Sequence, residues 1–112
     1  MELECTDMGQ ALVVRTRERR LDARLASEFK DRVGQLIENG HCRIVLSLAG
    51  VDFVDSSGLG AIVSCLKKLG PAGDLVICEV ADGVQQMFKL TRMDRVFRIL
   101  PTEAEGVAAL SA

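Results

Sequence analysis

Apolar residues recur along the chain with two different spacings, one typical of strands and the other typical of helices. Two short apolar runs, Leu3-Glu4-Cys5 and Ala11-Leu12-Val13-Val14, predict strands near the start of the chain. The segment between them, Asp7-Met8-Gly9-Gln10, consists largely of residues that favour turns. We therefore expect the two strands to form a hairpin.

A helical spacing begins near Ala23 and continues for about 15 residues. Its apolar positions are Leu25, Phe29, Val33, Leu36 and Ile37. Asp22 is a favourable N-cap for this helix, and Asn39-Gly40 is a typical C-terminal stop. The next run, residues 42–48, is apolar on nearly both faces, which predicts a central strand covered by helices on at least one side.

The rest of the chain continues to alternate helices with strands. The predicted elements are a helix marked by Leu59, Ile62, Val63, Leu66 and Leu69 and ended by Gly70-Pro71, a strand from Asp74 to Cys78, a helix marked by Val84, Met87, Phe88 and Thr91, a strand or extended segment from Val96 to Leu100, and a final helix that opens at Pro101. Thr102 and Glu105 fit a capping box in the final helix, and Val107 and Leu110 are its expected buried face. This order predicts an α/β domain with a mixed sheet of about five strands and about four helices, in which the later strands pair mostly in parallel.

Composition narrows the class of protein. The chain has 112 residues, of which 48% are hydrophobic and 27% are charged, and its formal net charge is −2. These values predict a single globular domain over residues 1–112, long enough to form a core without metals or disulfides. One histidine excludes a histidine-rich metal site, and the absence of Trp and Tyr disfavours a stacking surface for single-stranded nucleic acid. No apolar run approaches the ~20 residues of a membrane span and no signal peptide is evident, so we expect a cytoplasmic protein without membrane insertion.

The cysteines and arginines also have ordinary interpretations. Cys5, Cys42, Cys65 and Cys78 show no CxxC spacing, and we expect all four to be small buried hydrophobic residues in a reduced cytosol. No metal ligands and no cofactor are predicted.

Residues 15–24 carry five arginines, which would suit a nucleic-acid patch or a partner-facing basic surface. We favour a solvated loop and first helical turn, because the chain as a whole is slightly acidic.

The segment from Val51 to Val63, which joins the central strand to the second helix, is the most informative. Asp55, Ser56 and Ser57 fall at or just before the helix N-terminus, where backbone N–H groups lack partners and the helix dipole is positive. A serine hydroxyl at this place is accessible, and those N–H groups would stabilise a phosphate attached to it.

Two glycines, Gly58 and Gly60, follow in the first helical turn. Each costs about 1 kcal/mol relative to alanine inside a helix. The pair suggests a reason other than folding, namely a smooth surface that another backbone can approach closely, although the D-S-S-G string alone favours a simpler interpretation. The alternative is an ordinary Asp/Ser cap with glycines that suit a tight turn between strand and helix.

Other chemical interpretations of the segment fail on spacing. The chain contains neither a P-loop nor a G-x-S-x-G nucleophile elbow. The only histidine, His41, precedes the central strand and is about 23 Å from the serines that follow it, too far to act as their base. We therefore predict no catalytic residue and interpret His41 as a solvated turn residue.

Residues 43–48 followed by Val51-Asp52-Phe53-Val54-Asp55-Ser56-Ser57-Gly58-Leu59-Gly60 resemble the signature of STAS domains, and more narrowly that of bacterial anti-sigma factor antagonists. The likeness extends over essentially the whole chain. It implies a binding protein in transcription regulation that is not itself an enzyme. Its partner would be an anti-sigma factor that is also a serine kinase of the histidine-kinase-like ATPase fold.

The same resemblance implies a switch. The kinase would phosphorylate Ser56, the phosphorylated protein would release its partner, and a PP2C-type phosphatase would reset it. Family members carry the binding surface on residues that correspond here to Asp22, Asp55, Ser56, Ser57, Gly58, Leu59 and Gly60. One departure is Arg19, which stands where members usually have glycine and makes the path of that loop and the role of Asp22 open questions. An alternative is a constitutive STAS subunit of a membrane lipid-transport complex or of another signalling assembly.

Overall fold

A computed structural model of the chain describes residues 1–111. Its elements are β1 (Leu3–Asp7), β2 (Leu12–Thr16), β3 (Arg20–Leu21), α1 (Ala23–Glu38), β4 (Arg43–Ser47), β5 (Phe53–Val54), α2 (Ser56–Leu69), β6 (Asp74–Cys78), α3 (Asp82–Leu90), the 3₁₀ helix η1 (Met93–Arg95), β7 (Arg98–Leu100) and α4 (Glu103–Ser111).

The main sheet contains five strands in the order β1-β2-β4-β6-β7. β1 pairs antiparallel with β2, which confirms the predicted hairpin, and the remaining neighbours pair in parallel. β4 is the middle strand, and Ile44, Val45 and Leu46 within it are at most 1% exposed. The predicted mixed sheet with a central apolar strand is therefore confirmed.

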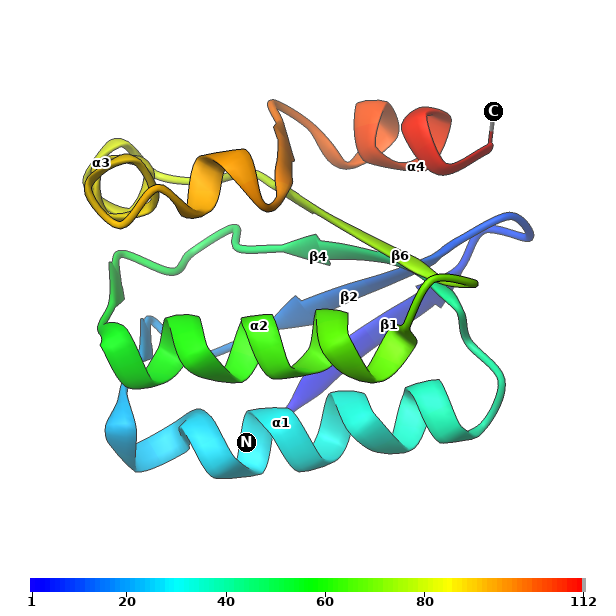
Figure 1. Ribbon diagram of the computed structural model, residues 1–112, viewed down its shortest axis with the longest axis horizontal. Coiled ribbons are helices and arrows are strands. Elements are labelled where there is room, and N and C mark those ends of the chain that lie inside the picture. Colours follow the sequence, from blue (N-terminus) through cyan, green and yellow to red (C-terminus); the bar gives the residue numbers. More distant parts are fainter. Residues whose placement is uncertain (112) are drawn as a thin grey trace.

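Two layers of helices enclose the sheet (Figure 1). α1 and α2 pack against each other over one face and cover the larger hydrophobic core, which includes Phe29, Ile62 and Phe88. α4 packs on β4 and β6 from the other face over a smaller core. Gly106 permits this close contact, because a Cβ atom there would lie 2.8 Å from the Val45 side chain.

The helix signals in the sequence correspond to real caps. The Asp22 side chain accepts a hydrogen bond from the Arg24 N–H at 3.1 Å, as predicted for the N-cap of α1. Gly70 ends α2 with a φ of 67°, a left-handed conformation that glycine adopts without strain. At α4, the Glu105 N–H donates to Thr102 Oγ1 at 3.1 Å, which supplies one of the two hydrogen bonds of the predicted capping box.

Three expectations from the sequence require correction. Cys5 and Cys42 are exposed, since Cys5 lies on the edge strand β1 and Cys42 precedes β4, so only Cys65 and Cys78 are buried. Arg15 belongs to β2 rather than to a solvated loop, because its register with Ser47 continues the sheet. Within residues 96–100, predicted as a strand or extended segment, only Arg98–Leu100 forms a strand, because the N–H groups of Val96 and Phe97 both donate to the Met93 carbonyl in the turn of η1.

A second sheet of two short strands was not predicted. β3 and β5 pair in parallel, with Arg20 opposite Phe53 and Leu21 opposite Val54. Each strand has only two residues, too few for an alternating pattern to stand out in the sequence. The pairing places the starts of α1 and α2 next to each other, and this juxtaposition forms the candidate site.

Candidate functional site

Ser56 is the first residue of α2 and its side chain is exposed, as is that of Ser57. Asp55, directly before it, has the extended backbone of an N-cap residue and accepts a hydrogen bond from the Gly58 N–H on Oδ1 at 2.9 Å. The cap consumes the donor at Gly58 and orders the first turn of α2. The serine hydroxyl therefore projects from a well-fixed helix start.

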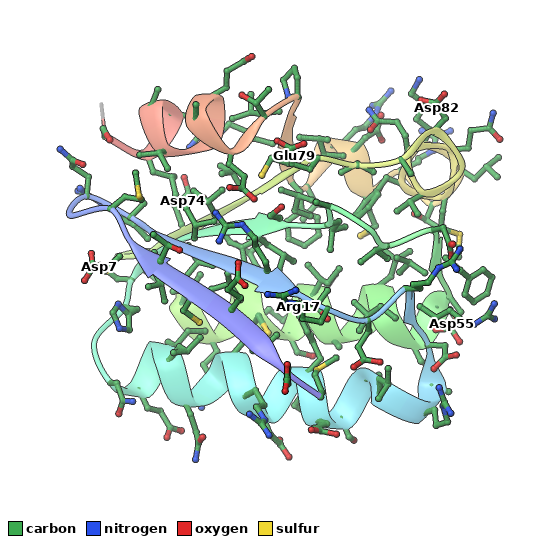
Figure 2. All side chains as sticks on the ribbon, turned by 180° about the vertical axis from the view of Figure 1, so that it is seen from behind. Asp7, Arg17, Asp55, Asp74, Glu79 and Asp82 are labelled. Carbon is green, nitrogen blue, oxygen red and sulfur yellow. The ribbon has the colours of Figure 1, made fainter. Side chains whose placement is uncertain are left out.

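Asp55 also binds the other helix. Its second oxygen, Oδ2, accepts a hydrogen bond from the Ala23 N–H of α1 at 3.1 Å. One carboxylate thus joins the N-termini of α1 and α2 at the end of the molecule where Figure 2 shows Asp55, opposite the end that holds Asp7. Asp22, half-buried beside this pair, is the cap of α1. The structure brings together the two acidic residues that the sequence placed 33 positions apart.

Backbone hydrogen bonds hold the loop that precedes α1 alongside the segment that contains β5. The Asp52 N–H donates to the Arg19 carbonyl at 2.8 Å, and the Asp55 N–H donates to the Leu21 carbonyl at 3.3 Å. The Arg19 guanidinium also pairs with the Asp52 carboxylate, with Nη2 and Oδ2 at 2.6 Å. Arg19 is therefore compatible with an ordered loop, and its place in that loop leaves Asp22 beside the serine motif.

Gly58 has a structural role, which agrees with the interpretation of the glycines as residues that suit the turn between strand and helix and not with that of a surface for a partner. It is buried, and a Cβ atom there would lie 2.2 Å from the Leu21 carbonyl oxygen. The backbone that approaches Gly58 is thus β3 of the same chain. Glycine is required at position 58 for folding. Gly60 differs, since it is exposed and a Cβ atom there would have no neighbour within 4 Å.

The motif residues therefore divide into two groups. Ser56, Ser57 and Gly60 are exposed and form the accessible surface of the first turns of α2. Leu59 is only 5% exposed and packs in the larger core, so like Gly58 it positions the helix and presents almost no side chain to a partner. The sequence motif combines surface residues with core residues because one helical turn has both an exposed and a buried face.

Phe53 is a feature that the sequence analysis quoted without assigning it a role. Its side chain is 38% exposed, and the Arg20 guanidinium lies 4.1 Å from the centroid of its ring. A cation over an aromatic face is a favourable contact of about 0.5–1 kcal/mol at an exposed position. Phe53 stands two residues before Asp55, between exposed Asp52 and buried Val54, and no alternating pattern in this two-residue strand marks it as exposed.

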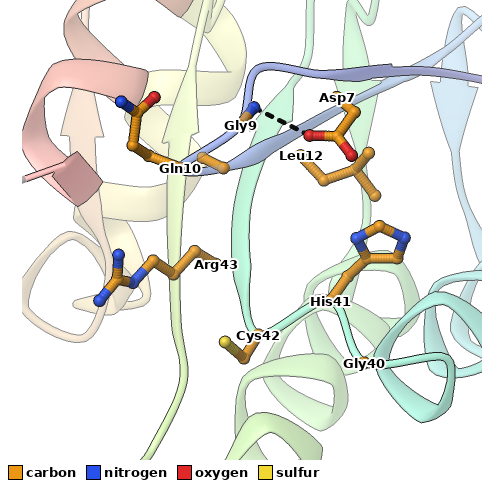
Figure 3. Close-up of a pocket in the computed structure, with 9 residues that line it drawn as sticks. Asp7, Gly9, Gln10, Leu12, Gly40, His41, Cys42 and Arg43 are labelled. Atoms are coloured by element: carbon orange, nitrogen blue, oxygen red, sulfur yellow. Dashed lines mark hydrogen bonds between the residues drawn. The ribbon is translucent and has the colours of Figure 1, made fainter.

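The histidine lies elsewhere. His41 is half-buried and lines a pocket of about 250 Å³ with Asp7, Gln10 and Arg43 (Figure 3). This pocket is at the amino end of β4, whereas Ser56 follows the carboxyl end of β4 through β5.

Within residues 1–111, no three His, Cys, Asp or Glu side chains are arranged to hold a metal ion. No helix in the same part of the chain is long and apolar enough to cross a membrane.

Comparisons with known proteins agree with this architecture. The family model described as "STAS domain" matches residues 3–106. The anti-sigma F factor antagonist of Paenibacillus polymyxa is 30% identical over 113 aligned positions, which cover 99% of this chain and 93% of that protein. The chain therefore belongs to the STAS domain family, and its similarity to that relative extends over nearly the full length of both proteins.

Solved structures share the fold. A crystal structure of an anti-sigma factor antagonist from Mycobacterium paratuberculosis superposes with a TM-score of 0.89 at 21% identity, covering 99% of this chain and 94% of that one. The Bacillus protein SpoIIAA in its phosphorylated form gives a TM-score of 0.71 at 18% identity, covering 97% and 99% of the two chains. The arrangement of four helices around a mixed five-stranded sheet is thus the STAS fold.

Proposed function

We propose that the chain, as a single STAS domain over residues 1–112, is an anti-sigma factor antagonist. In its unphosphorylated form it would bind an anti-sigma factor and so free the sigma factor. The supporting relative is the anti-sigma F factor antagonist that aligns over 99% of the chain. The single observation that carries the mechanism is the exposed hydroxyl of Ser56 at the capped start of α2.

The binding surface in this proposal is built on the joined starts of α1 and α2. Ser56, Ser57 and Gly60 make direct contacts, and the partly exposed Asp22 and Asp55 border them. Gly58 and Leu59 hold the turn in place from beneath. The absence of a side chain at Gly60 leaves room for a partner's backbone one turn into the helix.

The partner is an anti-sigma factor that is also a serine kinase of the histidine-kinase-like ATPase fold. It transfers the γ-phosphoryl group of ATP to the Ser56 oxygen, the Ser56 proton is released, and ADP leaves. A PP2C-type phosphatase hydrolyses the phosphoserine. The chain itself performs no catalysis and requires no cofactor, because kinase and phosphatase supply the chemistry.

Phosphate at Ser56 weakens the complex for an electrostatic reason. It adds about −1.5 to −2 charges next to the Asp55 carboxylate, which already accepts hydrogen bonds from the starts of both helices. In a close interface these like charges repel each other and must lose their hydration. A loss of about 3 kcal/mol of binding free energy corresponds to a roughly 150-fold weaker affinity.

The test combines each purified anti-sigma factor kinase of the source organism with the wild type and three variants. We expect ATP-dependent phosphate on Ser56 in the wild type and in Ser57→Ala, measured by mass spectrometry, and none on Ser56→Ala. In a binding assay, Ser56→Ala should retain the affinity of the wild type, and Ser56→Asp should bind at least about tenfold more weakly.

Two outcomes would contradict the proposal. Absence of phosphate on Ser56 with every kinase would exclude the switch. Equal partner affinity of Ser56→Asp and Ser56→Ala would show that charge at this position does not control binding, as expected for a constitutive subunit of a larger assembly.

A further inference from the structure

An apolar groove lies between β5 and α3, and it is separate from the first turn of α2. Its volume is about 360 Å³, and Phe53, Gly83, Met87 and Leu90 are among the residues that line it. Residues 83, 87 and 90 share one face of α3 because they are four and three positions apart. Gly83 leaves the groove open at one side, since no atom lies within 4 Å of a Cβ position there.

The groove holds the most exposed large apolar side chain of the described residues. Leu90 is 83% exposed, and Phe53 on the opposite wall is 38% exposed. A single exposed leucine is common on protein surfaces. Two large apolar side chains on facing walls of one groove are instead typical of a place that a partner's side chain occupies.

The charge around this groove identifies the chemistry of the partner. Lys89 lies in the last turn of α3, Arg92 in the turn that follows and Arg95 in η1, and none of the three forms an ion pair within residues 1–111. The arginines of the 15–20 segment are different, because each of the four is paired with a carboxylate. Residues 89–95 thus carry three unpaired cations against one unpaired acid, Asp94, and this excess of positive charge follows Leu90 along the chain at the α3 end of the groove. An acidic segment would complement it.

The groove is continuous with the proposed Ser56 surface through β5. Phe53 forms one wall, and the chain passes from it through Val54 directly to Asp55, the cap of α2. Arg20 covers the ring of Phe53 from the neighbouring strand β3. A partner seated on the start of α2 can thus extend over Phe53 to Leu90 without leaving the protein surface.

We infer that this groove binds an acidic, amphipathic segment of the same anti-sigma factor, with an apolar side chain between Phe53 and Leu90 and carboxylates near Arg92 and Arg95. The inference rests on the proposed function and adds a second contact region that does not contain the phosphorylated serine. A protein segment fits better than a membrane surface, because the site is a concave groove between β5 and α3 rather than a flat apolar face. The contact would determine which anti-sigma factor the chain selects.

The probe is the anti-sigma factor kinase that phosphorylates Ser56, and the variants are Leu90→Ser and Arg92→Glu. Both side chains are exposed, so the fold should tolerate the changes, which circular dichroism and urea unfolding verify. We expect Leu90→Ser to raise Kd for this kinase about tenfold. Arg92→Glu should raise it by a factor that shrinks as salt is added, because the contact is electrostatic.

Two variants at exposed positions outside the groove serve as matched controls. Met8→Ser removes another large exposed apolar side chain, 49% exposed in the β1–β2 turn, and Lys67→Glu reverses an exposed charge near the end of α2. Neither should change Kd. Unchanged affinity of Leu90→Ser, with wild type and controls binding normally, would overturn the inference and leave the proposed function intact.

Other occupants give distinct results. Loss of binding to phosphatidylserine vesicles in Leu90→Ser with unaltered kinase affinity would assign the groove to a membrane. Loss of a wild-type dimer in sedimentation equilibrium, again with unaltered kinase affinity, would assign it to a second copy of the chain. Either result overturns the inference, whereas a wild type that no kinase binds or phosphorylates refutes the proposed function itself.

Discussion

Gly58 and Gly60 both lack a side chain and lie in the same helical turn, yet their surroundings give them opposite roles. Gly58 faces the Leu21 carbonyl of β3, and Gly60 faces open space. The distinction depends on the β3–β5 pairing, which joins segments 33 positions apart in register. No local pattern in the sequence contains that information.

This difference gives a paired prediction for stability. Gly58→Ala should lower the free energy of unfolding by about 2 kcal/mol, since the added methyl group collides with backbone that cannot move aside as a side chain can. Gly60→Ala should leave it unchanged or raise it by up to about 1 kcal/mol, because alanine is the better helix former and meets no neighbour. Urea unfolding of both variants beside the wild type measures the two effects. Equal stabilities of the two variants would contradict the assignment.

Asp55 illustrates how much of the site a residue pattern can predict. The D-S-S-G string predicted an N-cap for the second helix, and the hydrogen bond to the Gly58 N–H confirms it. The second hydrogen bond, to Ala23 of α1, was not predictable, because it requires both helix starts to lie at the same end of the sheet. The role of Ser56 as the phosphorylated residue stays a prediction.

At the scale of elements, α4 is attached to the sheet by charge as well as by apolar contacts. Both oxygens of Glu103 accept hydrogen bonds from the Arg15 guanidinium at 2.6 Å, and the Glu103 N–H donates to Glu79 Oε2 at 3.1 Å. The hydrogen bond from Arg15 lowers the pKa of Glu103, outweighing the opposite effect of partial burial. The pair raises the pKa of Arg15 in turn.

The lowered pKa predicts a pH-dependent contribution of Glu103 to stability. The folded state favours the carboxylate, so the contribution is complete above pH of about 4.5, the ordinary value for Glu, and disappears as the pH falls through the lower folded value. We expect Glu103→Gln to cost about 1 kcal/mol at neutral pH and much less in acid. Glu105→Gln is the matched control, since Glu105 is exposed in the same turn of α4 and forms no ion pair within residues 1–111. A loss for Glu103→Gln that stays constant with pH would contradict the ion pair as its cause.

At the scale of the whole molecule, the four cysteines differ in solvent access, and so they show which parts of the fold exclude solvent. Burial raises the pKa of Cys65 and of Cys78 to about 11 each, whereas Cys5 and Cys42 lie on the surface. Thiolates are the reactive species, so both low access and a raised pKa protect a cysteine from alkylation.

We therefore expect iodoacetamide to modify Cys5 and Cys42 in the native protein at mildly alkaline pH. Cys65 and Cys78 should react only after denaturant is added. Peptide mass spectrometry of samples taken over time identifies each site. Native-state labelling of Cys65 as fast as that of Cys42 would show that α2 separates readily from the sheet.

The sequence by itself determined the order of the main elements, the caps of α1 and α2, and the α/β class, because apolar periodicity and capping act over a few neighbouring residues. It also carried the motif that marks the family. Only the tertiary structure decided that Asp55 holds two helices, that Gly58 and Leu59 are interior, that Cys5 and Cys42 are exposed, and that Phe53 faces Leu90 across a groove. Each of these facts depends on strand pairing and helix packing between distant segments, for which short-range patterns contain no signal.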